Sequence, residues 1–338
     1  MAGVSTGTVD RVLYDRGRVA ATTREKILQI VEDLNYRPNL LAQRLASDRI
    51  FHFGILIPMQ TGDNAYWRFP LKGIETAEKE LAGYRVTTYK FFFSLKNEST
   101  FIRASAKLLN TNPDAILLAP VFRKEANRFL HQCDKRNIPY VFIDSRIPGK
   151  NNLSYFGQDA RQSGLLAAKL MNLELAPESG ILIVNFVSQL DNHPHFRNRE
   201  NGFRQYFVDR SPDHNIDSLA ISPEAESRLP ELLADRITER TRGIFITSSA
   251  HKVAKILQGQ GYSNICCVGY DLTPHNLIYL KNDTIRFLIC QKPVSQGYEG
   301  LMALFNHFVR RGNIIKDHYM PLEIVTKENY MFYVENNS

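Results

Sequence analysis

The run Phe53-Gly54-Ile55-Leu56-Ile57-Pro58 begins the pattern that decides the fold of most of this chain. It is a short, almost wholly apolar segment, and similar segments alternate with stretches of helical periodicity as far as residue 311. Short apolar strands separated by helices of about 10 to 15 residues are typical of a parallel sheet covered by helices on both faces. We therefore predict an α/β, doubly wound parallel architecture.

The alternating segments fall into two sets. The first has predicted strands at 53–58, 86–93, 115–119 and 140–144, with helices at 70–82, 98–110 and 123–136. The second begins near Asn152, with strands at 180–185, 216–220, 243–247, 265–269 and 285–290 and helices at 158–173, 197–209, 224–239, 250–259 and 293–311. Two such sets predict two α/β lobes with a cleft between them, an arrangement typical of hinged small-molecule binders.

The N-terminal segment has a different character. Gly3-Val4-Ser5-Thr6-Gly7-Thr8-Val9-Asp10-Arg11-Val12-Leu13 predicts a short helix with one apolar face, capped by the Ser5 hydroxyl. The start of such a helix fits a DNA major groove. There Arg11 could reach a guanine, and Thr6 or Thr8 could meet a thymine methyl or a phosphate. An ordinary amphipathic surface helix is the alternative explanation of these residues alone.

Two more helices are predicted in this segment. Thr22-Thr23-Arg24-Glu25 fits a capping box, and the apolar residues that follow have the spacing of one buried helical stripe: Ile27, Ile30, Val31 and Leu34. Pro38 ends that helix, and Asn39 can cap a short third one that runs to Arg49. A helix of that length is marginal alone, so it needs a partner, such as its own copy in a dimer or a DNA groove. A plain interdomain linker is the alternative.

The ordered motifs of the first fifty residues together resemble the LacI/GalR family of transcription factors. They are Gly3-Val4-Ser5, Thr8-Val9, Arg11-Val12, Thr23-Arg24, Leu34-Asn35-Tyr36, Pro38-Asn39 and Ala42-x-x-Leu45. The resemblance implies a helix-turn-helix DNA-binding head at 1–37, a hinge helix at 38–49 and a periplasmic-binding-protein-like domain for effector binding and dimerisation at 50–338. The lobes of that domain are expected at about 50–150 with 292–320, and at about 151–291 with 321–334.

The resemblance also implies DNA contacts. Thr6, Gly7 and Arg11 would read bases, and Leu45 would wedge into a minor-groove base step, unstack it and bend the duplex. The expected DNA-binding residues are Ser5, Thr6, Gly7, Thr8, Arg11, Asn39, Ala42, Leu45 and Ala46. The family has one further helix before these motifs. We expect that helix to be encoded upstream, with Met1 as an internal residue of it; the alternative is a head that lacks it.

Candidate ligand-binding residues follow from the rule that ligands bind outside the carboxyl ends of parallel strands. Carboxylates, an arginine fork and an aromatic ring suit a polyhydroxylated sugar. The expected effector-binding residues are Trp67, assisted by Tyr66 and Phe69, and Asp144, Arg199, Ser248, Asp271 and Gln291. The resemblance places four of these at effector-contacting positions: Asp144, Arg199, Asp271 and Gln291.

Each of these residues also has a simpler explanation. Asp271 could cap the next helix, Trp67 could be a core residue, and Arg199 could be a solvated helix residue. The pair Ser248-Ser249 departs from the Asn-Asp pair that is common in the family, which leaves the identity of the ligand open.

Composition describes a globular protein, with 43% hydrophobic and 23% charged residues. The net charge is +7, but the first 49 residues hold eight Lys and Arg against six Asp and Glu, so charge alone is weak evidence for DNA binding. The sequence shows no signal segment and no apolar run of membrane-spanning length, so we expect a cytoplasmic protein. The cysteines lack metal-ligand spacing and are expected to be reduced core thiols: Cys133, Cys266, Cys267 and Cys290.

Motifs of common enzyme classes are missing from the sequence, including the nucleophile elbow, the dinucleotide-binding glycines and the P-loop. His193-Pro194-His195 lacks companion metal ligands, and Ser248 and Ser249, close to His251, are better explained by helix capping than by nucleophilic catalysis. The sequence therefore predicts no enzyme, no cofactor and no metal.

The favoured hypothesis is a DNA-binding transcription factor. It would be a repressor controlled by a sugar or a related small polar effector, and it would bind a palindromic operator as a homodimer. The alternatives are a cytoplasmic solute-binding module that does not bind DNA, and a carbohydrate-active enzyme that uses Asp144 and Asp271 as paired carboxylates. The C-terminal residues show no heptad repeat, so a coiled-coil tetramer is not expected.

Overall fold

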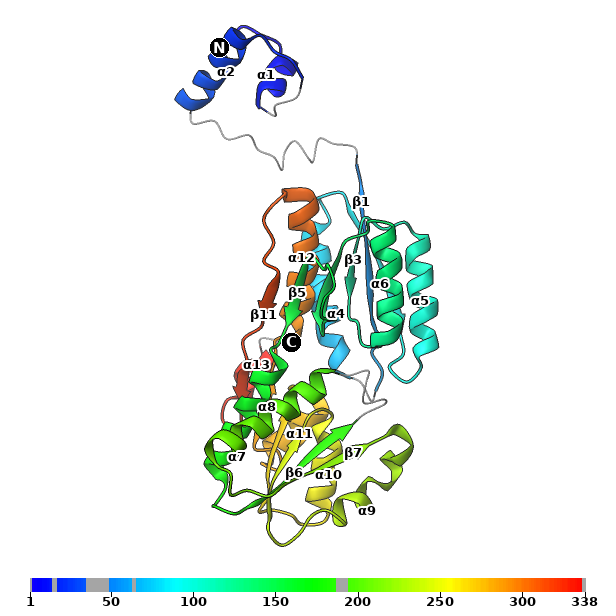
Figure 1. Cartoon of the computed structure of the whole chain (residues 1–338), viewed down its shortest axis with the longest axis vertical. Helices are drawn as coiled ribbons and strands as arrows, with labels where there is room; N and C mark the ends of the chain where they lie inside the picture. Colours follow the sequence, from blue (N-terminus) through cyan, green and yellow to red (C-terminus); the bar gives the residue numbers. More distant parts are fainter. Residues whose placement is uncertain (1, 14–16, 35–48, 63–64, 187–193, 336–338) are drawn as a thin grey trace. The chain divides into compact units, whose positions relative to one another are not determined.

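The computed structural model describes residues 2–13, 17–34, 49–62, 65–186 and 194–335 (Figure 1). The chain divides into two compact units, Met1–Arg49 and Ile50–Ser338, and each is described by itself. Nearly all of the hinge helix predicted at 38–49 lies outside the described residues, including Asn39, Ala42, Leu45 and Ala46.

The first unit contains two described helices, α1 (Thr6–Leu13) and α2 (Ala21–Asp33). The start of α1 is capped as predicted, because Ser5 Oγ accepts a hydrogen bond from the backbone N–H of Thr8 at 3.3 Å. Val12 of α1 and Ile27 of α2 are the buried apolar side chains of this unit among the described residues. The apolar face of α1 therefore points inward, and its polar face is left to solvent.

Two details of the α2 prediction are wrong. The helix begins at Ala21, and its N-cap Ala20 makes no side-chain hydrogen bond, so Thr22 lies inside the first turn and the capping box does not form. The predicted apolar stripe is only partly buried, since Leu34 is 54% exposed. The physical reason is that the short α1 covers only part of the apolar face of α2.

The second unit contains two six-stranded sheets among the described residues, which form the two predicted lobes. In lobe one the order is β11-β5-β4-β3-β1-β2 with parallel pairing throughout. Its strands are β1 (Phe51–Pro58), β2 (Val86–Phe93), β3 (Ala115–Leu118), β4 (Tyr140–Asp144), β5 (Ser154–Gly157) and β11 (Asp317–Tyr319). Figure 1 shows α5 (Glu98–Asn110) and α6 (Arg123–Lys135) on one side of this sheet, and α4 (Arg68–Leu81) and α12 (Pro293–Phe305) on the other; the short η1 (Ala65–Trp67) directly precedes α4.

In lobe two the order is β12-β10-β9-β8-β6-β7. Its strands are β6 (Gly180–Phe186), β7 (Ile216–Ile221), β8 (Thr241–Ile246), β9 (Cys266–Tyr270), β10 (Phe287–Cys290) and β12 (Glu323–Val325). Its helices are α7 (Ala160–Glu174), α8 (Pro194–Arg210), η3 (Pro223–Arg228), α9 (Leu229–Ala234), α10 (Ala250–Gly259), α11 (Pro274–Lys281) and α13 (Tyr330–Glu335). Because β12 pairs antiparallel with β10, this sheet is mixed rather than wholly parallel.

Short elements account for most of the differences from the prediction. The helix predicted at 224–239 is replaced by η3 and α9, each with a proline near its start, Pro223 and Pro230. The helix predicted at 293–311 ends at Phe305 and continues as a π-helical turn, η4 (Asn306–Arg310). The elements β5, β11, β12, α11 and α13 were not predicted, because these short segments mix polar and apolar residues without a continuous apolar run or a clear period.

Strand β5 moves the border between the lobes. It pairs with β4 and β11 in the sheet of lobe one, so the chain first crosses to lobe two after Gly157 rather than near residue 150. A second crossing joins β10 to α12, and a third joins β11 to β12. Gln158 lies on the first crossing and Gln291 on the second.

Two pairs of helices cross at backbone contact, one pair in each lobe. A Cβ on Gly164 of α7 would lie 1.9 Å from the carbonyl oxygen of Arg199 on α8, and a Cβ on Gly202 of α8 would collide with α7 in the same way. Gly73 of α4 and Gly297 of α12 make the equivalent crossing in lobe one. Only glycine permits so close an approach, so the crossing in lobe two fixes where Arg199 lies.

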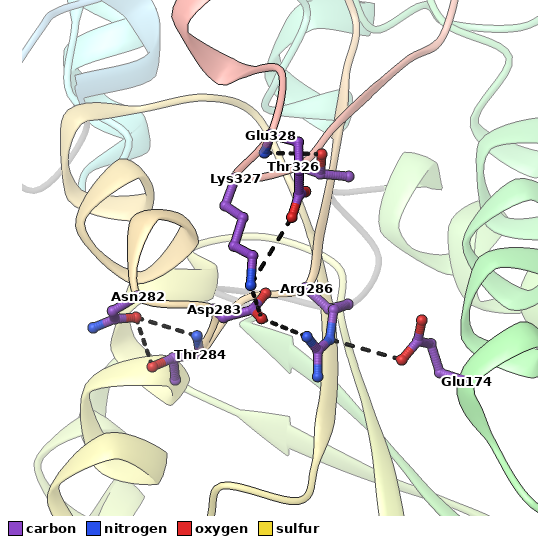
Figure 2. Close-up of polar contacts among 8 residues, drawn as sticks. All are labelled: Glu174, Asn282, Asp283, Thr284, Arg286, Thr326, Lys327 and Glu328. Carbon is purple, nitrogen blue, oxygen red and sulfur yellow. Dashed lines mark hydrogen bonds and ion pairs between the residues drawn. The ribbon is translucent and has the colours of Figure 1, made fainter.

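Figure 2 shows how the C-terminal segment is attached to lobe two. Asp283 Oδ2 accepts from Lys327 Nζ at 2.6 Å and from Arg286 Nη1 at 2.5 Å, and Arg286 Nε lies 3.8 Å from Glu174 Oε2. Each of these pairs is partly exposed and contributes about 0 to 1 kcal/mol. The network therefore orients the segment that follows β12 more than it stabilises the lobe.

None of the helices in the described ranges combines the length and apolar character that a membrane crossing needs. In the same ranges, no group of three or more His, Cys, Asp and Glu side chains is placed to hold a metal ion. All four cysteines are buried and free of disulfide bonds, as predicted. Burial raises the pKa of the Cys133 and Cys266 thiols to about 12.

Candidate functional site

A cleft of about 1060 Å³ lies between the two lobes of the second unit. All of the predicted effector-binding residues line it: Trp67, Asp144, Arg199, Ser248, Asp271 and Gln291. Four of them stand at the carboxyl ends of parallel strands, where the topology places ligand sites in open α/β sheets. Tyr66 lines the cleft as well, whereas Phe69 belongs to the buried face of α4.

Asp144 presents its carboxylate from the last residue of β4. Tyr66 donates its hydroxyl proton to Asp144 Oδ1 at 2.8 Å. The backbone of Asp144 is held in the left-handed region, with φ at 66°. Its N–H donates to Gln296 Oε1 at 3.0 Å, and its carbonyl accepts from the Tyr155 hydroxyl at 3.1 Å. These hydrogen bonds stabilise a backbone conformation that is unfavourable for a residue other than glycine. Strained backbone of this kind clusters at functional sites.

Arg199 extends into the cleft from α8. Only 3% of its surface is exposed, so the alternative explanation of Arg199 as a solvated helix residue is wrong. Its guanidinium lies over the Tyr270 ring, 3.6 Å from the centroid, and its Nη1 donates to the carbonyl oxygen of Thr247. The hydroxyls of Tyr270 and Ser163 are 3.0 Å apart and share a hydrogen bond. With its amide oxygen turned to the guanidinium, Gln158 accepts from Arg199 Nε at 3.2 Å.

Asp271 follows β9 and also has a positive φ, 64°. Gln291 Nε2 lies 3.3 and 3.2 Å from the two carboxylate oxygens of Asp271. The next helix, α11, is capped by Thr273, whose Oγ1 accepts from the N–H of Asn276, so Asp271 is not the helix cap. Its carboxylate is available to a ligand.

The expectation that the serines act as helix caps is wrong. Ser249 occupies the N-cap position of α10, but its side chain makes no capping hydrogen bond and its φ is 53°. In this left-handed conformation the hydroxyl does not reach the first turn of the helix. Ser248 and Ser249 both line the cleft.

Burial dominates the electrostatics of the two carboxylates. Desolvation raises the pKa of Asp144, opposed by the Tyr66 hydrogen bond and by Arg199. Desolvation also raises the pKa of Asp271 to about 7, opposed by Arg199 and reinforced by the charge of Asp144. One buried cation therefore faces two buried acids, and Asp271 titrates near neutral pH.

Ligand affinity is expected to depend on pH through Asp271. A hydroxyl group of the ligand donates a hydrogen bond to the ionised carboxylate of Asp271. Because the pKa of Asp271 is about 7, the ionised form is the minor one at lower pH. At pH 6 about one-tenth of Asp271 is ionised, so raising the pH from 6 to 8 should tighten binding about tenfold. Calorimetric titrations across this range test the expectation. An Asp271→Asn variant should bind the ligand more weakly, and its affinity should not depend on pH in this range. An unchanged pH dependence in this variant would contradict the assignment of Asp271.

The raised pKa of Asp271 has the opposite effect on the folding stability of the ligand-free protein, which decreases as the pH rises. The folded protein holds the Asp271 proton more tightly than an unfolded chain does, so stability falls as the pH rises from about 4 to about 7. A pH series of urea denaturation should show this slope in the native chain and a smaller one in Asp271→Asn.

Several residues of the cleft were not found from the sequence. Tyr270 lies beneath Arg199, although the alternation along β9 gave no reason to select it. Gln158 was missed because its preceding strand, β5, was not predicted. Phe196, 5.8 Å from the Arg199 guanidinium, lies in the first turn of α8 and was not selected.

In the first unit, the described candidate DNA-binding residues gather on one short helix and its cap. Ser5, Thr6, Gly7 and Arg11 are exposed and Thr8 is half-buried, while Val12 on the opposite face is buried. This leaves the polar face of α1 open to a partner.

Residues 1–39 match the model of bacterial regulatory proteins of the lacI family. Residues 53–311, most of the chain, match the model of the periplasmic binding protein domain. The chain belongs to the lacI family. It joins that family's DNA-binding head to a periplasmic-binding-protein-like domain, and it is a ligand-responsive DNA-binding regulator of transcription. A solute-binding module without DNA binding is not favoured, because such a module has no need of residues 1–39.

Relatives agree with this membership over nearly the whole chain. The ribose operon repressor of Lactococcus lactis is 29% identical over 316 residues, 90% of this chain and 88% of that protein. A solved structure described as a LacI transcriptional regulator from Bacteroides fragilis is 27% identical, with a TM-score of 0.79 over 84% of this chain and 100% of that one. A glucose-galactose binding protein from Geobacillus stearothermophilus, at 22% identity and a TM-score of 0.71 over 83% and 99% of the two chains, shares the fold.

Proposed function

We propose that this lacI-family regulator is a repressor whose affinity for DNA is controlled by a sugar, or a related polyhydroxylated compound, bound in the cleft. The observation that carries the proposal is the placement of buried Arg199 with Asp144 and Asp271 at the ends of facing sheets. Hydroxyl groups of a sugar can donate to the carboxylates and accept from the guanidinium. The names of the relatives, a ribose operon repressor and a glucose-galactose binding protein, support a sugar.

Each group of the cleft has a proposed role. Asp144 and Asp271 accept hydrogen bonds from ligand hydroxyls, with Gln291 and Ser248 as further polar partners. Trp67 provides an aromatic face for the C–H groups of the ring. We assign the carboxylates to binding rather than to catalysis, since the relatives are regulators and sugar-binding proteins.

Effector binding can be coupled to DNA binding through the crossings between the lobes. Gln291 stands on the second crossing, where its side chain donates to Asp271 and its carbonyl accepts from Gln296 Nε2 at 2.8 Å. Gln296, on α12 of lobe one, in turn accepts a hydrogen bond from the backbone N–H of Asp144 in the same lobe. A ligand that engages both carboxylates favours one arrangement of the lobes, and such differential affinity is enough to shift a conformational equilibrium.

On the DNA side we assign base and phosphate contacts to Ser5, Thr6, Gly7, Thr8 and Arg11, together with Asn39, Ala42, Leu45 and Ala46. The regulator would act on a palindromic operator as a homodimer, since two copies of a head then meet two half-sites. A protein with this role works where the DNA is, so we place it in the cytoplasm.

Two binding experiments on the full-length protein test the proposal. Calorimetry with a panel of sugars should identify a ligand, and fluorescence anisotropy on DNA selected from a random pool should identify an operator. We expect a cleft ligand to change operator affinity. The absence of binding by every sugar, with operator binding intact, would contradict a sugar effector.

Replacing Arg11 by alanine should weaken operator binding. A bidentate arginine contact to guanine contributes about 1 to 3 kcal/mol, so the affinity should fall about 10- to 100-fold and discrimination at one base pair should relax. Lys26→Ala, on the exposed side of α2, is the matched control and should change affinity much less. Competition with operators substituted at single positions measures both effects. Equal losses for all substituted operators would show that Arg11 contacts phosphate only.

A further inference from the structure

The cleft is longer than its cluster of charged groups. In lobe two it is lined from the ends of five neighbouring strands, in the sheet order β10, β9, β8, β6 and β7. The lining residues at these ends are Gln291, Asp271, Ser248, Phe186 and Ile221. Four steps of about 4.8 Å between neighbouring strands give a length of about 19 Å.

Lobe one also lines the cleft from several neighbouring strands. Asp144 ends β4, Val121 follows β3, and Glu98 belongs to the segment after β2 at the sheet edge. The groups that suit a sugar ring are concentrated at one end, near the crossings between the lobes. We call this end the hinge-side half, with Tyr66, Asp144, Arg199, Asp271 and Gln291. The remainder, lined by Glu98, Phe186, Ile221, Glu224 and Ser249, is called the outer half.

The length does not come from lobes held wide apart. His275 Nε2 of lobe two lies 3.1 Å from the carbonyl oxygen of Gly62 in lobe one, within hydrogen-bonding distance. Tyr66 of lobe one is close enough to Asp271 and Arg199 of lobe two for their charges to shift its pKa, with burial as the main cause of the increase. The two lobes therefore contact each other at the cleft.

The outer half suits an uncharged group. Two lysines line it. Lys252 is paired with Glu226 at 2.5 Å and lies 5.4 Å from the Phe186 ring, and Lys96 lies two residues before Glu98, which together with Glu224 adds negative charge nearby. His251 carries little positive charge at neutral pH, because burial, His275 and Lys252 lower its pKa to about 4. A phosphate would lack a concentrated positive partner here. Phe186 and the hydroxyl of Ser249 suit a second sugar ring, with an apolar face and polar edges.

The geometry points to an effector of at least two linked sugar units, with one ring in the hinge-side half and the next, uncharged, in the outer half. This inference rests on the proposed sugar effector and adds its size and charge. It also gives a role to Ser249, whose strained backbone directs a hydroxyl that caps no helix.

Calorimetry with two sets of probes tests the inference: D-ribose, D-glucose and D-galactose as single rings, and maltose, cellobiose, lactose, melibiose and trehalose as double rings. We expect one disaccharide to bind about tenfold more tightly than any single ring. Phe186→Ala and Glu224→Ala should each weaken that disaccharide by several-fold to tenfold and leave single-ring affinity unchanged. Val208→Ala, at a 72% exposed position on α8, is the control and should change neither.

The two proposals fail in different ways. Binding of single rings alone, unaffected by the two outer-half variants, would overturn the inference about size and leave the sugar effector standing. Tighter binding of D-glucose 6-phosphate than of D-glucose, measured in the same way, would overturn the inference about charge. Binding of none of these probes would contradict the sugar effector and the inference with it.

Discussion

Replacing Arg199 by alanine is expected to abolish effector binding while the protein stays folded and binds its operator. The guanidinium is buried against Tyr270, and its charge opposes the rise in pKa that burial causes at both Asp144 and Asp271. Without it, two buried carboxyl groups would face each other with no cation, and both would hold their protons more firmly. Loss of one member of such a buried charged cluster costs about 2 to 5 kcal/mol, or about 30-fold to several thousand-fold in affinity.

Two further variants make this experiment specific. Arg197→Ala removes an exposed arginine from the same helix and should leave effector affinity unchanged. Arg199→Lys keeps the charge but not the planar fork, so we expect an intermediate loss. Calorimetry measures the affinity, and circular dichroism checks the fold. If Arg199→Ala binds the effector as the native chain does, Arg199 does not belong to the binding site.

Replacing Gly202 by alanine is expected to destabilise lobe two by about 3 kcal/mol or more. The added Cβ would lie 2.0 Å from the carbonyl oxygen of Arg161 and 3.2 Å from its Cα, so the obstacle is backbone and cannot move aside as a side chain can. Helices α7 and α8 would have to separate, and Arg199 would move with α8. Effector affinity should therefore fall together with stability.

Gly259→Ala is the matched control for this substitution. It places the same methyl group at the end of α10, where nothing lies within 4 Å of the added Cβ. Stability should stay the same or rise by up to about 1 kcal/mol, because alanine favours the helix. Urea denaturation with a fixed m-value compares the two variants. Equal stabilities would show that the α7–α8 crossing is looser than 2.0 Å implies.

The longer helices and strands could be predicted from the sequence because their apolar residues recur at the spacing of a buried helix or strand face. The helix over 98–110 and the strand over 86–93 were predicted with the bounds that the structure shows. The segments around Ser154 and Glu323 could not be, because these short strands include polar residues and lack the continuous apolar run that revealed the equally short β3 and β10. Missing β5 also displaced the predicted border between the lobes.

The cleft residues were predictable where they follow recognisable strands. Asp144, Asp271 and Gln291 stand at such positions, and topology alone brings them to one edge. Tyr270 and Gln158 could not be selected in this way, because their role depends on the burial of Arg199, which is a property of the packed structure. The N-terminus of α2 was predicted incorrectly because several consecutive residues could begin that helix.

Control of DNA binding by the sugar is tested by the operator affinity of the protein with and without its sugar, measured by fluorescence anisotropy at two salt concentrations. We expect a sugar bound in the cleft to change this affinity at least about tenfold, within the usual range of coupling between two sites, and we expect Arg199→Ala to remove the change but not the DNA binding. A sugar that occupies the cleft and leaves operator affinity unaltered would contradict control of DNA binding by the cleft.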